Sequence, residues 1–275
     1  WQLPVLLLGV GLLAVGVYFA LPKYVPTDYE AKLASAEAFV VKDRQKEAEE
    51  ALTALAEDDN FAESVPEPTM GHYWQLYGDL RYRQLDDHVW QGITTKVGQE
   101  NLAQIADHYR QAQKLGRELP AEALWRYAQV PAALGDDQGA LAVVDQMPIE
   151  SVTRRHKVVR SLVERAVQTD PDPSSEKVAN LLRRFEAEVA QEPNVVTRRH
   201  EKIWAMRLRA ERLLRAGDEQ AVIRMLVEGG LMRLKNGGAS DLDLAPLNIV
   251  LGEAYALEES FVDARHRFDA ADRHL

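Results

Sequence analysis

The stretch Pro246–Leu275 reads PLNIVLGEAYALEESFVDARHRFDAADRHL, and its pattern decides the fold. Its apolar and small residues recur at intervals of three and four, which places them on one face of a helix. We therefore expect two helices that pack as a hairpin. Small residues at Gly252 and Ala264 would let the helices approach closely, and Tyr255 and Phe268 would fill the space between neighbouring hairpins.

The same helical spacing is present throughout the chain beyond residue 27, and strand-like alternation is missing. Helices of three to four turns are separated by clusters of glycine, proline, aspartate and asparagine, and they arrive in pairs. These breaks fall at Asp58–Asn60, Pro66–Pro68, Gly116, Gly135–Asp137, Pro171–Pro173, Gly217–Asp218 and Asn236–Ser240. The sequence therefore predicts an all-α fold.

Earlier segments repeat the spacing of residues 246–275, with decreasing clarity. Residues 121–147 carry Leu124, Ala128, Ala140 and Val144 at the corresponding positions. A second unit has Trp74, Tyr77 and Gly78 in its first helix, and its second helix is displaced to residues 100–115, with Tyr109 and Ala112. A third unit, residues 29–58, carries Ala36, Phe39, Ala48 and Leu52. The displacement leaves an insertion at residues 84–99.

A second internal repeat is the sequence VTRRH, which occurs at Val152–His156 and again 44 residues later at Val196–His200. Thr153 and Thr197 are the expected helix N-caps. We favour two related hairpins, each with a solvated basic first turn, over a tandem ligand site. The basic cluster is expected to be solvated or paired with neighbouring glutamates, and it consists of Arg154, Arg155, Lys157 and Arg160.

These units resemble the tetratricopeptide-repeat family over most of residues 27–275, in about six helix pairs. One hairpin cannot bury its apolar face alone, whereas stacked hairpins form a continuous core. The resemblance implies a right-handed α-solenoid over residues 29–275, whose first helices line a concave surface that binds peptides or proteins. The Lys and Asn pattern of the carboxylate clamp is not present, which argues against a cytosolic chaperone adaptor.

The family pattern also implies which side chains face this concave surface and bind a partner. In one unit they are His72, Gln75, Asp79, Tyr82 and Arg83, and in the next they are Glu122, Trp125 and Gln129. Packing against the adjacent repeat is the alternative role for all of them. Trp90 lies in the polar insertion, where it either anchors the loop to its own domain or serves as an interface hot spot.

The N-terminal residues 1–22 contain no charged side chain. LPVLLLGVGLLAVGVYFAL, residues 3–21, would span about 28 Å as a helix, which is close to the thickness of a bilayer core. A signal peptide normally has a shorter apolar region, and a buried core helix of this length is unusual at a chain end. We therefore expect residues 1–22 to form a single transmembrane anchor, followed by a short linker at residues 23–28.

The positive flank on the C-terminal side of this segment is weak, with only Lys23 and Lys32 nearby. This allows translocation of the following domain. A cysteine-free acidic domain fits a periplasmic or other extracytoplasmic location, and we expect the protein in a bacterial inner membrane. The last repeat is cut before its closing proline, so we expect the natural chain to continue.

Composition and motifs argue against several kinds of chemistry. The chain has no cysteine and a net charge of -10, so thiolate metal sites are excluded and nucleic acid is not an expected partner. The seven histidines lack metal-ligand spacing and are expected to be solvated or capping. Gly229–Gly230 and Gly237–Gly238 are interpreted as helix-ending or loop glycines. No cofactor, metal or catalytic residue is predicted within residues 1–275.

The sequence thus predicts a membrane-anchored scaffold, or an accessory subunit of a larger membrane complex, that binds other proteins through its repeats. One alternative is a transient assembly or quality-control factor for secreted or membrane proteins. Another is the regulatory repeat region of an enzyme whose catalytic domain lies beyond Leu275.

Overall fold

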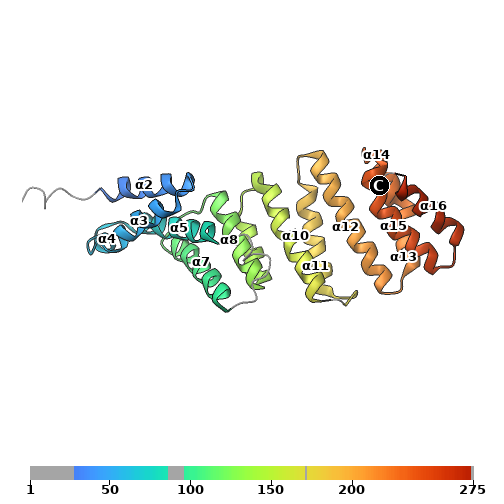
Figure 1. The fold of residues 1–275 in the computed structure, drawn as a ribbon, viewed down its shortest axis with the longest axis horizontal. Helices are drawn as coiled ribbons and strands as arrows, with labels where there is room; N and C mark the ends of the chain where they lie inside the picture. Colours follow the sequence, from blue (N-terminus) through green and yellow to red (C-terminus); the bar gives the residue numbers. More distant parts are fainter. Residues whose placement is uncertain (1–27, 86–95, 171, 274–275) are drawn as a thin grey trace, which may run out of the picture. The chain divides into compact units, whose positions relative to one another are not determined.

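The computed structural model describes residues 28–85, 96–170 and 172–273, and within these ranges the chain is helical and contains no strand (Figure 1). The all-α prediction is therefore confirmed. Within the same ranges, no helix has both the length and the apolar character needed to cross a membrane. The expected anchor at residues 3–21, and Trp90, lie outside the described residues.

Each predicted break that the structure describes falls between helices or at a helix end. The helices are α2 (Tyr29–Val41), α3 (Gln45–Ala56), α4 (Phe61–Ser64), α5 (Glu67–Gln84), α7 (Lys96–Lys114), α8 (Ala121–Leu134), α9 (Asp137–Gln146), α10 (Val152–Thr169), α11 (Glu176–Ala190), α12 (Val195–Arg215), α13 (Glu219–Met225), α14 (Leu231–Asn236), α15 (Asp241–Leu257) and α16 (Phe261–Asp272). They belong to two compact units. Of the described residues, unit 1 holds 28–85 and 104–119, and unit 2 holds 96–103, 120–170 and 172–273.

Unit 1 is built around the hairpin of α2 and α3, with α5 packed against both helices. The turn between α2 and α3 contains Asp43 at a φ of 56°, a conformation that Asp tolerates better than most residues. Ala36, Ala48 and Leu52 are fully buried at the centre of this hairpin. The helical spacing predicted for residues 29–58 is therefore confirmed.

The contact between α5 and the second half of α7 completes unit 1. A Cβ atom at Gly78 would lie 3.2 Å from the ring of Tyr109, so a side chain at this position would require the ring to shift. The Tyr109 hydroxyl donates a 2.7 Å hydrogen bond to Asp79. A helix over the expected residues 100–115 is confirmed, although α7 begins at Lys96 and ends at Lys114.

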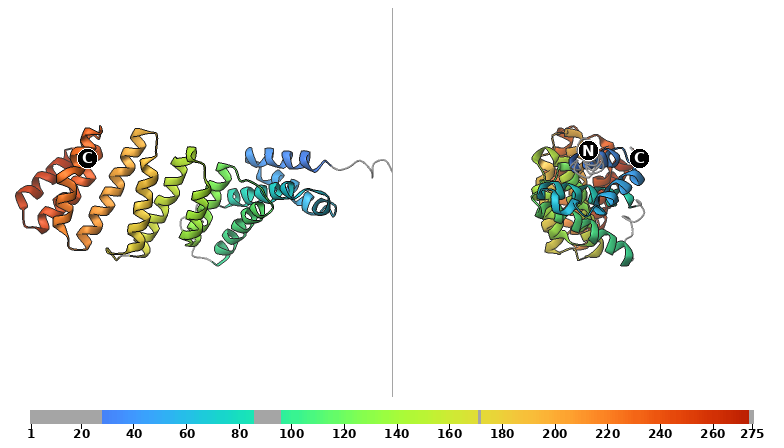
Figure 2. Two further views of the ribbon diagram at one scale, coloured as in Figure 1. Left: turned by 180° about the vertical axis from the view of Figure 1, so that it is seen from behind. Right: turned by 90° about the vertical axis from the view of Figure 1, so that its left-hand side faces the viewer.

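Unit 2 consists of hairpins that follow one another in chain order: α8–α9, α10–α11, α12–α13 and α15–α16 (Figure 2). Each hairpin contacts the next, through α8 with α10, α11 with α12, and α12 with α15. A π-helical turn at Leu226–Gly230 and the short α14 lie between α13 and α15. This arrangement is the neighbour-to-neighbour stacking of a helical repeat fold.

The last hairpin has the close approach that its sequence predicts. A Cβ atom at Gly252 would lie 2.7 Å from Cε1 of Phe268, and Ala264 is buried. Phe268 therefore packs against Gly252 within its own hairpin, and 38% of it is exposed. Its expected place between neighbouring hairpins stays a prediction. Tyr255 packs against the apolar core that α12, α13 and α15 share, as expected.

The two predicted threonine caps are wrong. Helix α12 is capped by Asn194, whose Oδ1 accepts from the backbone N–H groups of Val196 and Thr197 at 3.0 and 3.1 Å. Thr153 lies inside the first turn of α10, where its hydroxyl donates to Glu192 at 2.7 Å. A cap must lie outside the helical conformation, and both threonines are already within it.

Three arginines of the basic cluster in α10 form ion pairs with glutamates, which is one of the two alternatives predicted for this cluster. Arg155 and Arg160 make ion pairs of 2.8 and 2.9 Å with Glu188 and Glu201, and Arg154 pairs with Glu122. The description of this first turn as solvated is wrong for His156, which is fully buried with its Nε2 3.0 Å from Glu192. His156 lies on the face of α10 that packs against the next segment of chain.

Candidate recognition groove

Two of the residues expected on a partner-binding surface are buried inside unit 1. Gln75 is 4% exposed, and its Oε1 accepts a 2.9 Å hydrogen bond from Nε of Arg117. Asp79 is 5% exposed and accepts from Tyr109. Both side chains join α5 to the segment that follows it, which is the packing role that the sequence left open.

The other three predicted residues of unit 1 are partly buried. Nε2 of His72 lies 3.5 Å from Glu37, and the pKa of His72 is lowered because burial, and then the charge of Arg117, disfavour the imidazolium. Arg83 lies 3.8 Å from Asp43. Tyr82 lies on the same helix, one residue before Arg83.

The predicted residues of unit 2 lie on α8. Glu122 makes ion pairs with Arg126 and Arg154, and the Arg154 guanidinium also lies 5.9 Å from the ring centroid of Trp125. Nε2 of Gln129 is buried without a hydrogen-bond partner among the described residues. Glu122 and Trp125 are thus brought together through one arginine of α10.

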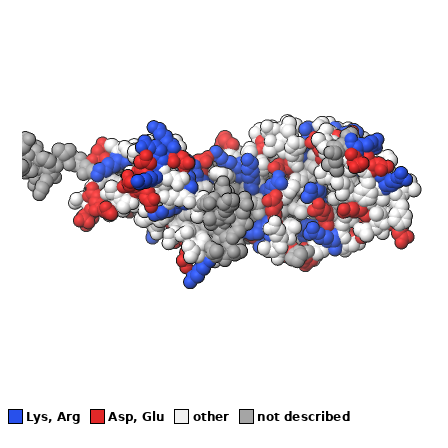
Figure 3. Space-filling model, in the orientation of Figure 1, with Lys and Arg blue, Asp and Glu red and all other residues white. Residues whose placement is uncertain are grey.

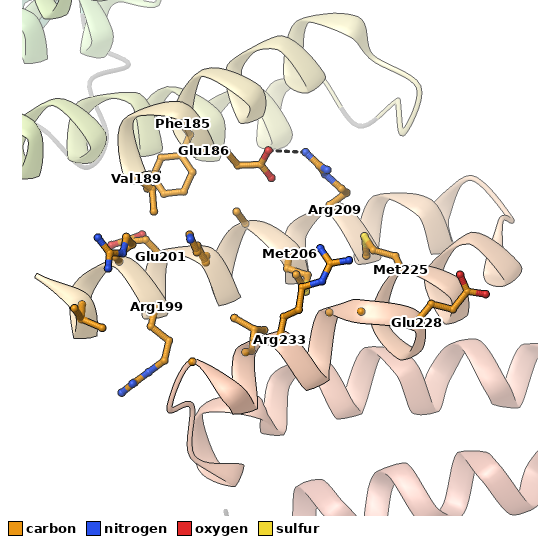
Figure 4. Close-up of a pocket in the computed structure, with 18 of the residues that line it drawn as sticks. Phe185, Glu186, Val189, Arg199, Glu201, Met206, Arg209, Met225, Glu228 and Arg233 are labelled. Carbon is orange, nitrogen blue, oxygen red and sulfur yellow. Dashed lines mark hydrogen bonds and ion pairs between the residues drawn. The ribbon is translucent and has the colours of Figure 1, made fainter. Parts of the chain in front are cut away.

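A different part of unit 2 forms a groove with a volume of about 750 Å³, which is within the range of ligand sites. Its walls come from α11, from α12, and from the segment α13–π turn–α14 (Figure 4). The lining residues are Phe185, Glu186, Val189, Val195, Arg198, Arg199, Glu201, Lys202, Ala205, Met206, Arg209, Arg224, Met225, Glu228, Gly229, Gly230, Arg233, Leu234 and Gly237. None of them was predicted as a site residue.

The π-helical turn determines the shape of one wall. A Cβ atom at Gly230 would lie 2.9 Å from Sδ of Met206 and 2.9 Å from the carbonyl oxygen of Met225, so only glycine fits without rearrangement. The interpretation of Gly229–Gly230 as helix-ending or loop glycines is therefore wrong, since both lie within this helical turn. Single π turns often occur at functional sites. Gly237 and Gly238 do follow the end of α14, as predicted.

Several charged groups of the groove are used within the fold. Arg209 reaches across to Glu186 on α11 at 2.7 Å, as the dashed line in Figure 4 marks. Glu201 binds Arg160 at 2.9 Å. Arg198 donates to the carbonyl oxygen of Glu192 at 2.8 Å. The ion pairs of Arg209 and Glu201 hold α12 against α11 and α10.

A buried polar network supports the start of α12. Glu192 is 2% exposed and accepts hydrogen bonds from Thr153 and from the backbone N–H of Asn194, with His156 also at hydrogen-bond distance. Burial alone would raise the pKa of Glu192, but these hydrogen bonds together outweigh it and lower that pKa. The carboxylate therefore remains ionised inside the protein and joins α10 to the segment that enters α12.

The polar groups of the groove are cations and carboxylates, and they surround an apolar floor. Among the described residues, no group of three or more His, Cys, Asp or Glu side chains could hold a metal ion. No protein-family model matches the chain, and comparisons with curated sequences and with solved structures gave no significant similarity. One signal in the sequence could have indicated this site, namely the glycine pair set between methionines of a helical segment.

Proposed function

We propose that this protein is a membrane-anchored scaffold that holds partner proteins at a membrane surface, as an accessory subunit of a larger complex. The observation that supports this most directly is the groove of unit 2, which is formed on stacked helix hairpins and combines an apolar floor with charged walls. Stacked hairpins offer extended surfaces that suit protein partners. The same stacking is consistent with a tetratricopeptide-like α-solenoid.

In this proposal, residues 3–21 supply the anchor, because they form an uncharged apolar stretch of suitable length. Residues 29–275 then stand on the extracytoplasmic side of a bacterial inner membrane. Anchoring raises the effective concentration of the groove near membrane-bound partners, which strengthens binding without any new contact.

The test is photo-crosslinking in intact membranes, with a photoreactive amino acid at Glu228 on the groove or at the exposed Lys157 on α10. We expect a discrete protein adduct from position 228, none from position 157, and retention of the chain in the membrane pellet after an alkaline wash. Absence of a protein adduct at position 228 would remove the main support for a scaffold.

Purification in detergent then separates the two modes of binding. Stoichiometric co-purification of the crosslinked partner indicates a structural subunit. Failure of the partner to mature when the gene is deleted, with no stable co-purification, indicates a transient assembly factor instead.

A further inference from the structure

The groove carries cations that the fold does not use. Lys202, Arg224 and Arg233 line it, all three are exposed, and none makes an ion pair with any residue in the part of the chain that the structure describes. Of the carboxylates in the lining, Glu186 and Glu201 are already bound to arginines. Three cations are therefore available to a ligand at this one site.

This local balance is opposite to that of the whole chain, whose net charge is -10. Acidic and basic side chains are interspersed over the face of unit 2 displayed in Figure 3. Within the groove the remaining carboxylate is Glu228, against three unpaired cations. A ligand with several negative charges would thus meet attraction here, and exposed charges of this kind mainly determine partner choice and association rate.

The floor of the groove is apolar. Phe185, Val189 and Ala205 are buried beneath it, and Met206 and Met225 line it beside the glycines of the π turn. Methionine side chains adapt to apolar groups of different shape. The guanidinium of Arg233 lies over the π turn, since a Cβ atom at Gly229 would be 2.7 Å from it. The cation and the apolar floor are therefore adjacent.

We propose that the groove binds an acidic peptide segment of a partner protein, in which carboxylates alternate with one or two large apolar side chains. The carboxylates meet Lys202, Arg224 and Arg233, and the apolar side chains enter the floor between α12 and the π turn. This inference rests on the proposed scaffold function and specifies the chemistry of its partner. A nucleic acid fits less well, because it needs a long basic surface and the chain is acidic overall.

The experiment uses the full 275-residue chain in detergent and a fluorescent peptide in which Glu residues are interspersed with Leu and Phe. We compare the wild type with the double variant Arg224→Gln, Arg233→Gln. The matched control is Lys157→Gln, Arg215→Gln, which removes the same charge from exposed positions that do not line the groove. Thermal unfolding checks that each variant is folded.

We expect the groove variant to bind the peptide roughly tenfold more weakly, which is the loss of two exposed ion pairs, and the control to bind within about twofold of the wild type. Binding to the wild type should also weaken as salt is added. Equal affinities for the groove variant and the wild type would overturn the proposal.

Three further ligands test the chemistry of the occupant. A peptide with Lys in place of Glu should not bind, and one with Gly in place of Leu and Phe should bind roughly tenfold more weakly, because the floor stays empty. Equal binding of either peptide would overturn the proposal. So would competition by an oligonucleotide or by anionic vesicles that matches the acidic peptide, since the groove would then be a general polyanion site.

The two proposals can fail separately. A protein adduct at position 228 without acidic-peptide binding would leave the scaffold function standing and remove this inference. Tight, Arg233-dependent peptide binding without any adduct in membranes would support the groove chemistry and argue against the scaffold function.

Discussion

The carboxylate of Glu192 shows how one residue connects several segments of unit 2. It is almost completely buried, yet it stays ionised because Thr153, the backbone of Asn194 and His156 surround it with polar partners. A buried carboxylate is tolerated only when such partners are present. This residue lies directly before the helix that forms one wall of the groove.

At the residue scale we predict a pH-dependent effect of Glu192→Gln. The pKa of Glu192 is lowered from its ordinary value of 4.5, so its ionised form stabilises the fold above that pH, and this stabilisation is lost as the pH falls through the lowered value. At neutral pH the variant should lose about 1–3 kcal/mol of unfolding free energy. Below about pH 4.5, the difference in unfolding free energy between the variant and the wild type should become smaller, as measured by urea titration.

Glu150→Gln is the control for this prediction, because Glu150 is exposed and lies outside the network. It should change the unfolding free energy little at any pH. A deficit of Glu192→Gln that stays constant from neutral pH to pH 3 would show that ionisation of this carboxylate does not stabilise the fold.

At the scale of the helix, α12 begins where Asn194 caps it. The sequence VTRRH suggested a threonine cap, but Val195 is already the first helical residue. Asn and Thr both suit the cap position, so residue type alone did not discriminate between them. The position at which the chain leaves the preceding turn determines which residue caps α12. Glu192 stabilises that turn.

We therefore predict that Asn194→Ala lowers the unfolding free energy by about 1 kcal/mol, because two backbone N–H groups lose their acceptor. Thr197→Ala should change it by less than about 0.5 kcal/mol, since alanine suits the inside of a helix. Urea unfolding monitored by circular dichroism measures both variants. If Thr197→Ala lowered the unfolding free energy more than Asn194→Ala, the result would support Thr197 as the cap instead.

At the scale of the whole molecule, unit 2 is a series of hairpins in which each contacts its neighbours. The core around α12, α13 and α15 includes Leu247 and Leu251, which are fully buried. In such a stack, a destabilising substitution lowers the stability of the adjacent hairpins more than that of distant ones. This separates a repeat fold from a globular domain with one central core.

We predict that Leu251→Ala costs about 2–5 kcal/mol and lowers amide-exchange protection most in α12, α13, α15 and α16. Helices α8 and α9, which form the hairpin three positions before α15–α16 in unit 2, should keep most of their protection. Leu242→Ala, on the exposed side of the same helix, should change little. Hydrogen-exchange mass spectrometry gives the pattern, and a uniform loss over unit 2 would contradict stacking by neighbours.

The sequence by itself determined the helical class, the breaks between helices and the close approach at Gly252, because these follow from local spacing and from the lack of a side chain. It did not determine which polar residues are buried, as Gln75, Asp79 and His156 show. Only the tertiary structure decided the groove, whose walls come from segments that the sequence separates, between residues 185 and 237. Helical periodicity acts over a few residues, whereas a groove depends on how distant helices pack and on which charges that packing leaves unpaired.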